Sequence, residues 1–323
     1  MSKTICIIDY EVGNILSVKR SIEILGFNAV VSNKEDKILN KEELIIASKG
    51  CDGILSSLTE KFDNDLISKL PDSIKIISNF AVGFGNIDIE SAKKKNIVVT
   101  NTPDVLTDAT AEIAMLILLG AARRAKEGTQ WVNKKNWKWS ADFLMGKQLT
   151  GSRLGILGMG RIGRAVAEKA RAFGMKIHYY NRSRLNKNLE KDAIYHKSLE
   201  SLLSVSDFFS INCPATKETK HIINKNTIKY FPDGAVVSNS ARGDMIDDEA
   251  MVEALKNGKI FSLGLDVYNG EPNIHPEYLT LPNVYVLPHL GSATKKTRTA
   301  MADLAVNNID EFFKTGKCKN TVN

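Results

Sequence analysis

Three polar residues stand where predicted strands end, and their side chains together suit one reaction. They are Arg242, Glu271 and His289. Hydride reduction of a 2-oxo acid needs a cation that binds the carboxylate and polarises the carbonyl, and a planar guanidinium does so bidentately. It also needs an acid that protonates the carbonyl oxygen near neutral pH, which histidine does, and a neighbouring carboxylate stabilises the charged histidine. Each residue alone also fits an ordinary loop, whereas the set predicts acid-assisted hydride transfer.

A glycine-rich turn supplies the second chemical feature. Gly158, Gly160 and Gly163 occupy the three glycine positions of G-x-G-x-x-G, between a predicted strand at 154–157 and a helix at 161–173. They allow a tight turn, close approach to a pyrophosphate, and close helix packing, in that order. The first helical residues, Arg161 and Ile162, would offer N–H groups to the pyrophosphate. A plain Gly-rich turn is the alternative, but the strand predicted at 176–180 completes a dinucleotide-binding unit.

The loop after that second strand indicates which nicotinamide is used. An NAD enzyme places an acidic residue about 20 residues beyond the glycine turn, where it accepts the ribose hydroxyls. Here that place holds Asn181, followed by Arg182, Ser183 and Arg184. These side chains can bind a 2′-phosphate, which an acid would repel, so we expect NADPH to be preferred and NAD to be possible. Two solvated arginines are the alternative.

Strands and helices alternate along the first hundred residues. The pattern predicts strands at 4–8, 29–31, 53–56, 74–78 and 97–99, and helices at 15–25, 41–48 and 63–69. Such alternation implies an α/β fold with a doubly wound parallel sheet, which binds its ligands at the carboxyl ends of the strands.

A second alternating series follows and carries the chemical residues. A helix is predicted at 107–127, and from residue 151 the pattern is again β-α-β. Beyond the glycine turn it predicts helices at 199–205 and 248–257 and strands at 208–211, 235–238, 261–265 and 284–286. A long amphipathic helix at 293–314 is expected to pack back on the first domain.

A short glycine-containing segment follows the strand at 74–78. In it Gly83 and Gly85 could let backbone N–H groups point at a small anion, and a plain turn is the alternative. Farther on, Trp137 and Trp139 lie in a stretch at 135–145 that resembles an arm. Exposed aromatics usually need a partner surface, and core filling within one chain is the other interpretation.

Composition excludes several classes of protein. The 323 residues and formal charge of +7 fit a two-domain globular protein, and the lysines are scattered, so no nucleic-acid partner is expected. The cysteines Cys6, Cys51, Cys213 and Cys318 show no metal or disulfide spacing, so reduced thiols in a cytoplasmic protein without metal are expected. The apolar segment 113–122 is too short to cross a bilayer, so no membrane partner is expected either.

The motifs in this order resemble those of the NAD(P)-dependent D-2-hydroxyacid dehydrogenases. The resemblance rests on the glycine turn at 158–163, 241–243, Asp266 with 270–272, 288–293 and 308–313. Within the family, 58–61 and 106–112 most resemble the glyoxylate and hydroxypyruvate reductases. The match runs over nearly all of the chain from about residue 54 onward.

The resemblance implies roles for named residues. Arg242, Glu271 and His289 would be the catalytic triad, and the N–H groups of Val82 and Gly83 would hold the substrate carboxylate near Ser57 and Leu58. It also implies that the arm around 113–145 wraps a second subunit, which gives a homodimer. Besides the glycine turn, the 181–184 loop and His289, the implied cofactor contacts are Thr107, Cys213, Pro214, Ser240, Ala241, Asp266 and Gly291.

The amino-terminal stretch departs from this pattern. Residues 4–33 resemble the start of the glutamine amidotransferase subunit of imidazole glycerol phosphate synthase more than a dehydrogenase. No nucleophile-elbow cysteine or His-x-Glu pair follows, and Cys51 lacks the glycine-flanked turn that such a nucleophile needs. The resemblance therefore implies no glutaminase activity.

We predict a two-domain α/β enzyme. A flavodoxin-like substrate domain comprises 1–101 plus 290–323, and a Rossmann cofactor domain comprises 102–289, with a dimerisation arm at about 107–150 and the active site in the cleft between domains. The expected reaction is reduction of a small 2-oxo acid of the glyoxylate or hydroxypyruvate type to the D-2-hydroxy acid. The rivals are a dinucleotide-sensing binding protein, a phosphite or formate dehydrogenase, and an amidotransferase.

Overall fold

The computed structural model describes residues 2–8, 15–32, 39–135 and 137–323. They divide into two compact units. The first comprises Met1–Leu106 and Ala293–Asn323, and the second comprises Thr107–Ser292.

The first unit is built on a five-stranded parallel sheet in the order β2-β1-β3-β4-β5. This is the flavodoxin-like order, which confirms the fold class predicted for this part of the chain. The strands are β1 (Thr4–Ile8), β2 (Asn28–Ser32), β3 (Gly53–Ser56), β4 (Ile76–Asn79) and β5 (Val98–Thr100). The helices are α1 (Ile15–Ile24), α2 (Lys41–Ala47), α3 (Asn64–Lys69), α4 (Ile89–Lys94) and α13 (Lys295–Thr315).

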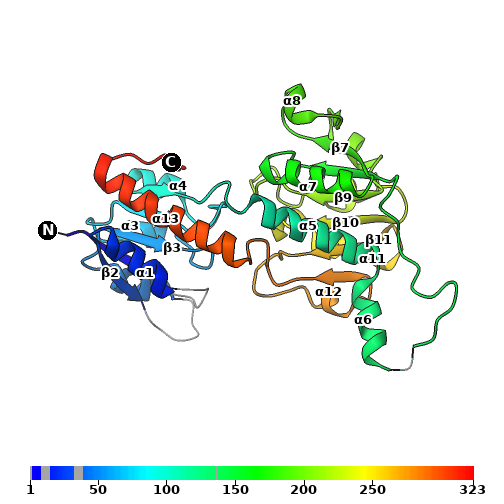
Figure 1. The fold of residues 1–323 in the computed structure, drawn as a ribbon, viewed down its shortest axis with the longest axis horizontal. Helices are drawn as coiled ribbons and strands as arrows, with labels where there is room; N and C mark the ends of the chain where they lie inside the picture. The colour runs from blue at the N-terminus through cyan, green and yellow to red at the C-terminus, as the bar shows by residue number, and fades with distance from the viewer. Residues whose placement is uncertain (1, 9–14, 33–38, 136) are drawn as a thin grey trace. The chain divides into compact units, whose positions relative to one another are not determined.

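Alternate strand residues of this sheet bury opposite faces. On β1, Ile5 and Ile7 pack with residues of α1 and α13, whereas Cys6 and Ile8 pack with residues of α2, α3 and α4. Helices α1 and α13 lie side by side on their shared face (Figure 1). The period of two in a strand requires this division, because successive side chains point to opposite faces.

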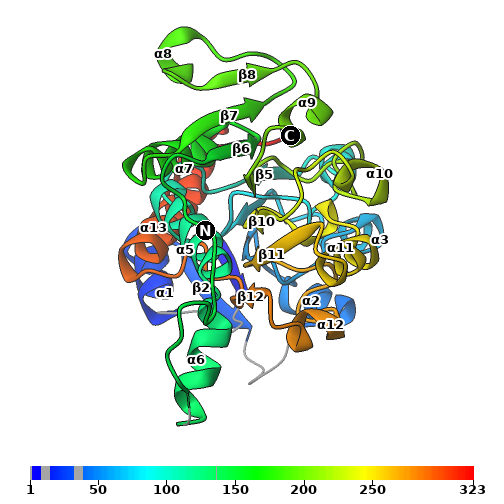
Figure 2. The same cartoon turned by 90° about the vertical axis from the view of Figure 1, so that its right-hand side faces the viewer.

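The second unit contains a seven-stranded parallel sheet in the order β12-β11-β10-β9-β6-β7-β8, which Figure 2 shows from β8 to β12. Counted from β6, this order extends the Rossmann arrangement by one strand and confirms the predicted fold class. The strands are β6 (Arg153–Leu157), β7 (Lys176–Tyr180), β8 (Ile194–His196), β9 (Phe208–Ile211), β10 (Ala235–Asn239), β11 (Ile260–Leu265) and β12 (Val284–Val286).

Helices cover both faces of this larger sheet. Residues of α5 and α7 pack on one face with Leu154, Ile156 and Tyr179, and residues of α9, α10 and α11 pack on the other with Phe209 and Ile211. The helices are α5 (Thr107–Ala122), α6 (Ala125–Asn133), α7 (Arg161–Ala172), α8 (Lys187–Glu190), α9 (Leu199–Leu203), α10 (Lys225–Ile228), α11 (Asp248–Lys256) and α12 (Pro276–Thr280), with a 3-10 turn, η1, at Gly243–Met245.

The single helix predicted at 107–127 is wrong, because two helices occupy that region. Arg124 adopts a left-handed backbone with φ of 54°, which ends the run of helical hydrogen bonds from α5. Its guanidinium makes two hydrogen bonds to the Glu127 carboxylate, 2.8 and 2.6 Å long. The sequence gives no glycine or proline signal for such a break, because residues 121–125 read Ala-Ala-Arg-Arg-Ala.

The carboxyl-terminal segment returns to the first unit, as predicted. Ser78 Oγ of β4 donates a hydrogen bond to the Ala305 carbonyl of α13. After α13, Thr321 forms an antiparallel bridge with Thr100. Of the amidotransferase-like segment at 4–33, residues 9–14 and 33 lie outside the described residues.

Candidate active site

The three glycines of the turn between β6 and α7 differ in their surroundings. Gly158 has φ of 92°, and a methyl group on it would lie 2.5 Å from the Cys213 backbone nitrogen. A methyl group on Gly163 would lie 2.2 Å from the Gly158 carbonyl oxygen, so the helix needs glycine to pack on the turn. Gly160 faces open space within 4 Å. The turn therefore leaves room beside Gly160, at the N-terminus of α7, where a pyrophosphate fits.

The end of β7 is tied to this glycine turn. The Asn181 side-chain oxygen accepts a hydrogen bond from the Met159 N–H at 2.7 Å. Arg182 and Ser183 are exposed, and the Arg184 guanidinium makes a bidentate pair with Glu190. The segment predicted to determine the cofactor preference thus begins beside the glycine turn, where Asn181 contacts Met159, and Arg184 in the same segment pairs with Glu190.

Cys213 and Pro214 follow β9 and border the glycine turn. Cys213 contacts Gly158 through its backbone, and its thiol lies 3.7 Å from Met245 Sδ. Burial raises the pKa of this thiol to about 11. A raised pKa keeps this thiol protonated at neutral pH, which makes it a poor nucleophile, and the Cys213 backbone limits the space beside Gly158.

The structure brings His289 and Glu271 into direct contact. His289 Nδ1 lies 2.7 Å from Glu271 Oε2, and Glu271 Oε1 accepts a 2.8 Å hydrogen bond from the Tyr268 N–H. Burial would raise the pKa of Glu271, but the bonds from His289 and Tyr268 and the charge of Arg242 hold it below its usual range. Glu271 is therefore ionised at neutral pH and orients the imidazole with its Nε2 free to act.

Tyr268, which sequence reasoning missed, links the loops that carry the three polar residues. Its hydroxyl donates a 2.6 Å hydrogen bond to the Leu287 carbonyl, shortly before His289. Its backbone also packs against Gly243, where a methyl group would lie 1.8 Å from the Tyr268 carbonyl carbon. An aromatic residue after a strand carries no sequence signal for this role, because the contacts arise only in the folded chain.

Arg242 is held by its backbone and leaves most of its guanidinium unused. The Arg242 carbonyl accepts a 2.7 Å hydrogen bond from Asn239 Nδ2, and its own Nη1 donates to the Ala241 carbonyl. Burial lowers the pKa of Arg242, and the side chain forms no ion pair with any described residue. A half-buried cation with donors that no described residue uses is suited to a substrate carboxylate.

Asp266 organises the segment after His289. Its two carboxylate oxygens accept hydrogen bonds from the N–H groups of Leu290 and Gly291, at 2.7 and 2.9 Å. Burial raises the pKa of Asp266 to about 6, against the lowering effect of these two bonds. Asp266 thus holds the loop that contains both His289 and Gly291.

Other predicted cofactor contacts lie at the ends of the same elements. Thr107 begins α5, and Arg161 and Ile162 begin α7. Ser240 and Ala241 follow β10, where the Ser240 hydroxyl is buried and bonds to no described residue. An unsatisfied buried hydroxyl beside the loop of Arg242 is consistent with a site completed by a bound cofactor.

The predicted substrate contacts of the first unit form a local loop cluster. The carbonyls of Val82 and Gly83 accept hydrogen bonds from Asn101 and Asn79, and their N–H groups donate to no described residue. The Ser57 N–H donates to Glu60, whose carboxyl is buried with a raised pKa. Val82 and Gly83 therefore present two adjacent free donors, the arrangement suited to a small anion.

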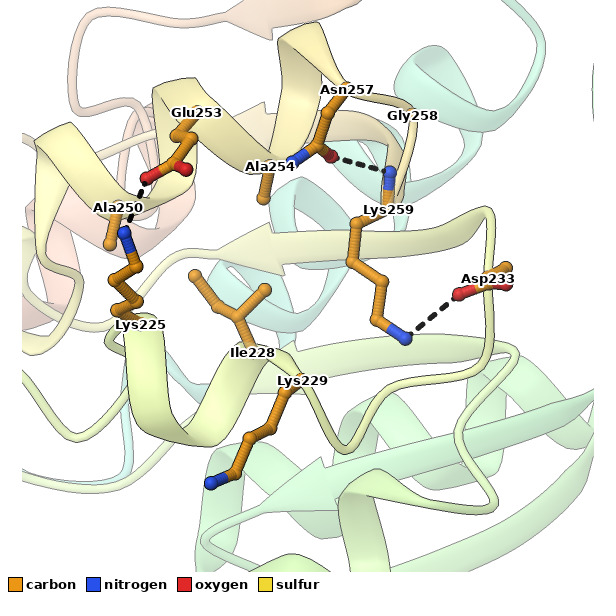
Figure 3. Close-up of a pocket in the computed structure, with 10 residues that line it drawn as sticks. All are labelled: Lys225, Ile228, Lys229, Asp233, Ala250, Glu253, Ala254, Asn257, Gly258 and Lys259. Carbon is orange, nitrogen blue, oxygen red and sulfur yellow. Dashed lines mark hydrogen bonds and ion pairs between the residues drawn. The ribbon is translucent and has the colours of Figure 1, made fainter.

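A shallow hollow of about 500 Å³ lies away from this chemistry, between α10 and α11 (Figure 3). Its lysines Lys225 and Lys259 are paired with Glu253 and Asp233 across or beside the hollow. None of the catalytic candidates lines it, so we assign it no part in the reaction.

In the described part of the chain, no group of acidic, histidine and cysteine side chains could hold a metal, and no helix has the length and apolar character to span a bilayer.

The order of the larger sheet and its glycine turn define a dinucleotide-binding enzyme of the Rossmann class. Comparison with known proteins agrees: residues 115–291 match the model of the D-isomer specific 2-hydroxyacid dehydrogenase NAD-binding domain. The chain belongs to this family, whose members are NAD(P)-dependent oxidoreductases acting on CH–OH donors.

Relatives cover most of the chain. Glycerate dehydrogenase of Hyphomicrobium methylovorum is 44% identical over 88% of this chain and 89% of its own. Glyoxylate reductase of Thermococcus litoralis is 41% identical over 90% of this chain and 89% of its own. The crystal structure of an NADPH-dependent glyoxylate/hydroxypyruvate reductase from Sinorhizobium meliloti, in complex with NADP and malonate, has a TM-score of 0.86 at 31% identity, covering 99% of this chain and 97% of that one. The family resemblance drawn from the motifs is thereby confirmed.

Proposed function

We propose that this enzyme reduces a small 2-oxo acid of the glyoxylate or hydroxypyruvate type to the D-2-hydroxy acid, with NADPH preferred over NADH. The observation that carries the proposal is the 2.7 Å contact between His289 and Glu271, with Arg242 at the end of the neighbouring strand β10. The names of the relatives from Hyphomicrobium, Thermococcus and Sinorhizobium support the substrate class.

The protein's own residues would supply the acid and the orientation. A reduced nicotinamide, when bound, would supply a hydride for the carbonyl carbon. His289, held through Nδ1 by Glu271, donates the Nε2 proton to the carbonyl oxygen as that oxygen gains charge. Glu271 stays ionised and stabilises the imidazolium before transfer, and solvent returns the proton to His289 afterwards.

The substrate carboxylate would be bound by donors that the folded protein leaves free. Arg242 offers guanidinium donors, and Val82 and Gly83 offer backbone N–H groups. Ser57 and Leu58 are proposed to contact the remainder of the substrate. The partner is thus a small anionic acid with a carbonyl next to its carboxylate.

The preference for NADPH rests on the segment after β7. Asn181 uses its side-chain oxygen toward Met159, which leaves its amide N–H groups to donate, and no carboxylate occupies this position. Exposed Arg182 can pair with a 2′-phosphate. A charge pair near 4 Å at a partly exposed site is worth at most about 4 kcal/mol before desolvation, so about 10² or more in kcat/KM is expected.

We also propose the division of labour and assembly drawn from the sequence. Residues 1–101 with 290–323 form the substrate domain, 102–289 the cofactor domain, and the arm at about 107–150 binds a second subunit in a homodimer. Trp139 and Met145 in this arm are 80% and 64% exposed, which supports a partner surface. Sedimentation of the purified protein tests this point, and a monomer at micromolar concentration contradicts it. A cytoplasmic location stays a prediction that rests on four free thiols.

The experiment is a panel of 2-oxo acids with both reduced nicotinamides. We expect higher kcat/KM for glyoxylate and hydroxypyruvate than for 2-oxoisocaproate, graded by about 1 to 3 kcal/mol per misfitting group. Hydroxypyruvate should yield D-glycerate. A higher value for 2-oxoisocaproate, or equal values for NADPH and NADH, contradicts the corresponding half of the proposal.

The same panel separates the rival functions. Dinucleotide binding without turnover of any 2-oxo acid would identify a sensor, and oxidation of formate or phosphite would identify the closer rival. The carboxylate of Glu271 weighs against formate, for which the counterpart resembles an amide. Glutamine hydrolysis would reveal an amidotransferase.

A further inference from the structure

Arg184 stands in the segment proposed to bind the 2′-phosphate, yet its guanidinium already has a partner. Its Nε and Nη2 donate to the Glu190 carboxylate at 3.0 and 2.9 Å. Glu190 lies at the end of α8, and its side chain is only 5% exposed. A buried carboxylate is costly unless it is paired and hydrogen-bonded, so this pair is not readily given up to an exposed phosphate.

The same carboxylate reaches the core through Tyr179 of β7. The Tyr179 hydroxyl donates to Glu190 Oε1 at 2.7 Å and accepts a 3.1 Å hydrogen bond from the Leu185 N–H. Tyr179 is fully buried. A rigid strand residue therefore holds both Glu190 and the backbone immediately after Arg184.

The other end of the segment is fixed as well. Asn181 is held by the Met159 N–H of the glycine turn at 2.7 Å, and its carbonyl accepts from the Tyr195 hydroxyl of β8 at 3.4 Å. Between these anchors, Arg182 and Ser183 are exposed and make no hydrogen bond or ion pair with the residues that the structure describes.

We propose that Tyr179, Arg184 and Glu190 form a positioning clamp that sets the backbone of residues 181–185 and thereby determines selectivity for the 2′-phosphate. Arg182 and Ser183 then bind the phosphate, and Arg184 acts through Glu190 without touching it. This inference rests on the NADPH preference proposed above. It replaces the expectation that both arginines bind the phosphate.

The test uses adenosine fragments, so that binding is read without turnover. Calorimetric titration of the ligand-free protein compares 2′,5′-ADP with 5′-AMP for the unmodified chain, Glu190→Gln, Arg184→Ala and the double variant. Glu190→Gln should weaken the binding of 2′,5′-ADP on the order of tenfold or more, because misplacement of binding groups is costly. The affinity for 5′-AMP should be nearly unchanged. The double variant should lose no more affinity for 2′,5′-ADP than either single variant, because each single substitution already removes the same clamp.

Asp207→Asn is the matched control. Asp207 also makes a bidentate pair with an arginine, Arg153, with bonds of 2.9 and 2.7 Å at the start of β6. The change from carboxylate to amide is the same, but the pair lies at the opposite end of the strands from residues 181–185. Asp207→Asn should therefore leave the ratio of the two affinities unchanged.

The outcomes are distinguishable. If Arg184 binds the phosphate itself, Glu190→Gln will keep or strengthen 2′,5′-ADP binding, which overturns the clamp. Additive losses in the double variant also overturn it. If the unmodified protein binds both fragments equally, the NADPH preference fails and the clamp has no selectivity to determine.

Discussion

His289 Nδ1 lies 2.7 Å from Glu271 Oε2, although the two residues follow different strands, β11 and β12, and stand eighteen positions apart. This contact occupies Nδ1 of the imidazole, so Nε2 is the nitrogen that would protonate a substrate. It is the geometry expected of a general acid with its orienting carboxylate.

His289→Ala removes the proposed proton donor. We expect kcat to fall by about 10² to 10⁴, the range typical of general acid catalysis, while the cofactor still binds. Steady-state kinetics and fluorescence titration with NADPH measure the two quantities. Near-normal turnover in this variant would exclude the mechanism.

Glu271→Gln removes the negative charge of Glu271. That charge is present at neutral pH in the unmodified protein, because the pKa of Glu271 is held below its usual range. The imidazolium that donates the proton loses the opposite charge beside its Nδ1, and a nearby opposite charge favours the charged form of a group. The pH optimum for reduction should move downward. A pH profile of kcat/KM superimposable on that of the unmodified enzyme would show that the carboxylate does not support the acid.

Gly243→Ala tests the packing between the loops of Arg242 and Glu271. The new methyl group would lie 1.8 Å from the Tyr268 carbonyl carbon, so backbone must move. We expect about 1 to 3 kcal/mol of destabilisation and a marked loss of kcat, with cofactor binding kept.

Gly128→Ala is the control for that substitution, since its added methyl group in α6 meets no described atom within 4 Å apart from its chain neighbours and the helix's own backbone. It should be neutral or slightly stabilising, because alanine is favoured over glycine within a helix. Equal kcat in the two variants would mean that the contact between Gly243 and Tyr268 does not position the catalytic loops.

Asp266→Asn tests a pH-dependent contribution to stability. Because burial raises the pKa of Asp266 to about 6, the folded state binds this proton more tightly than the unfolded state. The contribution of this proton to the free energy of unfolding is complete below the unfolded-state pKa of Asp266, near 4, and is lost as the pH rises through 6. Relative to Asp266→Asn, the unmodified protein should therefore lose about 2 kcal/mol between about pH 4.5 and pH 7.5.

Urea unfolding of both proteins without cofactor measures this difference. The comparison cancels the titration of the other groups, because they are common to both chains. A difference between the two proteins that does not change with pH would show that Asp266 is already ionised in the folded state throughout this range.

The sequence alone determined the class of the fold and selected the candidate catalytic residues. Glycine positions such as 158 and 163 are dictated by backbone geometry that no other residue tolerates, so the spacing itself predicts the turn. Arg242, Glu271 and His289 could be selected because each stands after a buried strand, and parallel strands end at one edge. Strand alternation likewise predicted both sheets.

One local break in a helix and the contacts between distant segments were decided only by the folded structure. The break at Arg124 depends on a left-handed residue and an ion pair with Glu127 that hydrophobic periodicity does not encode. The roles of Tyr268 and Asn239 depend on loops that meet after folding. Arg182 and Arg184 look equivalent in the sequence, and only the burial of Glu190 beside Tyr179 separates them, because a charge buried in the fold must be paired there.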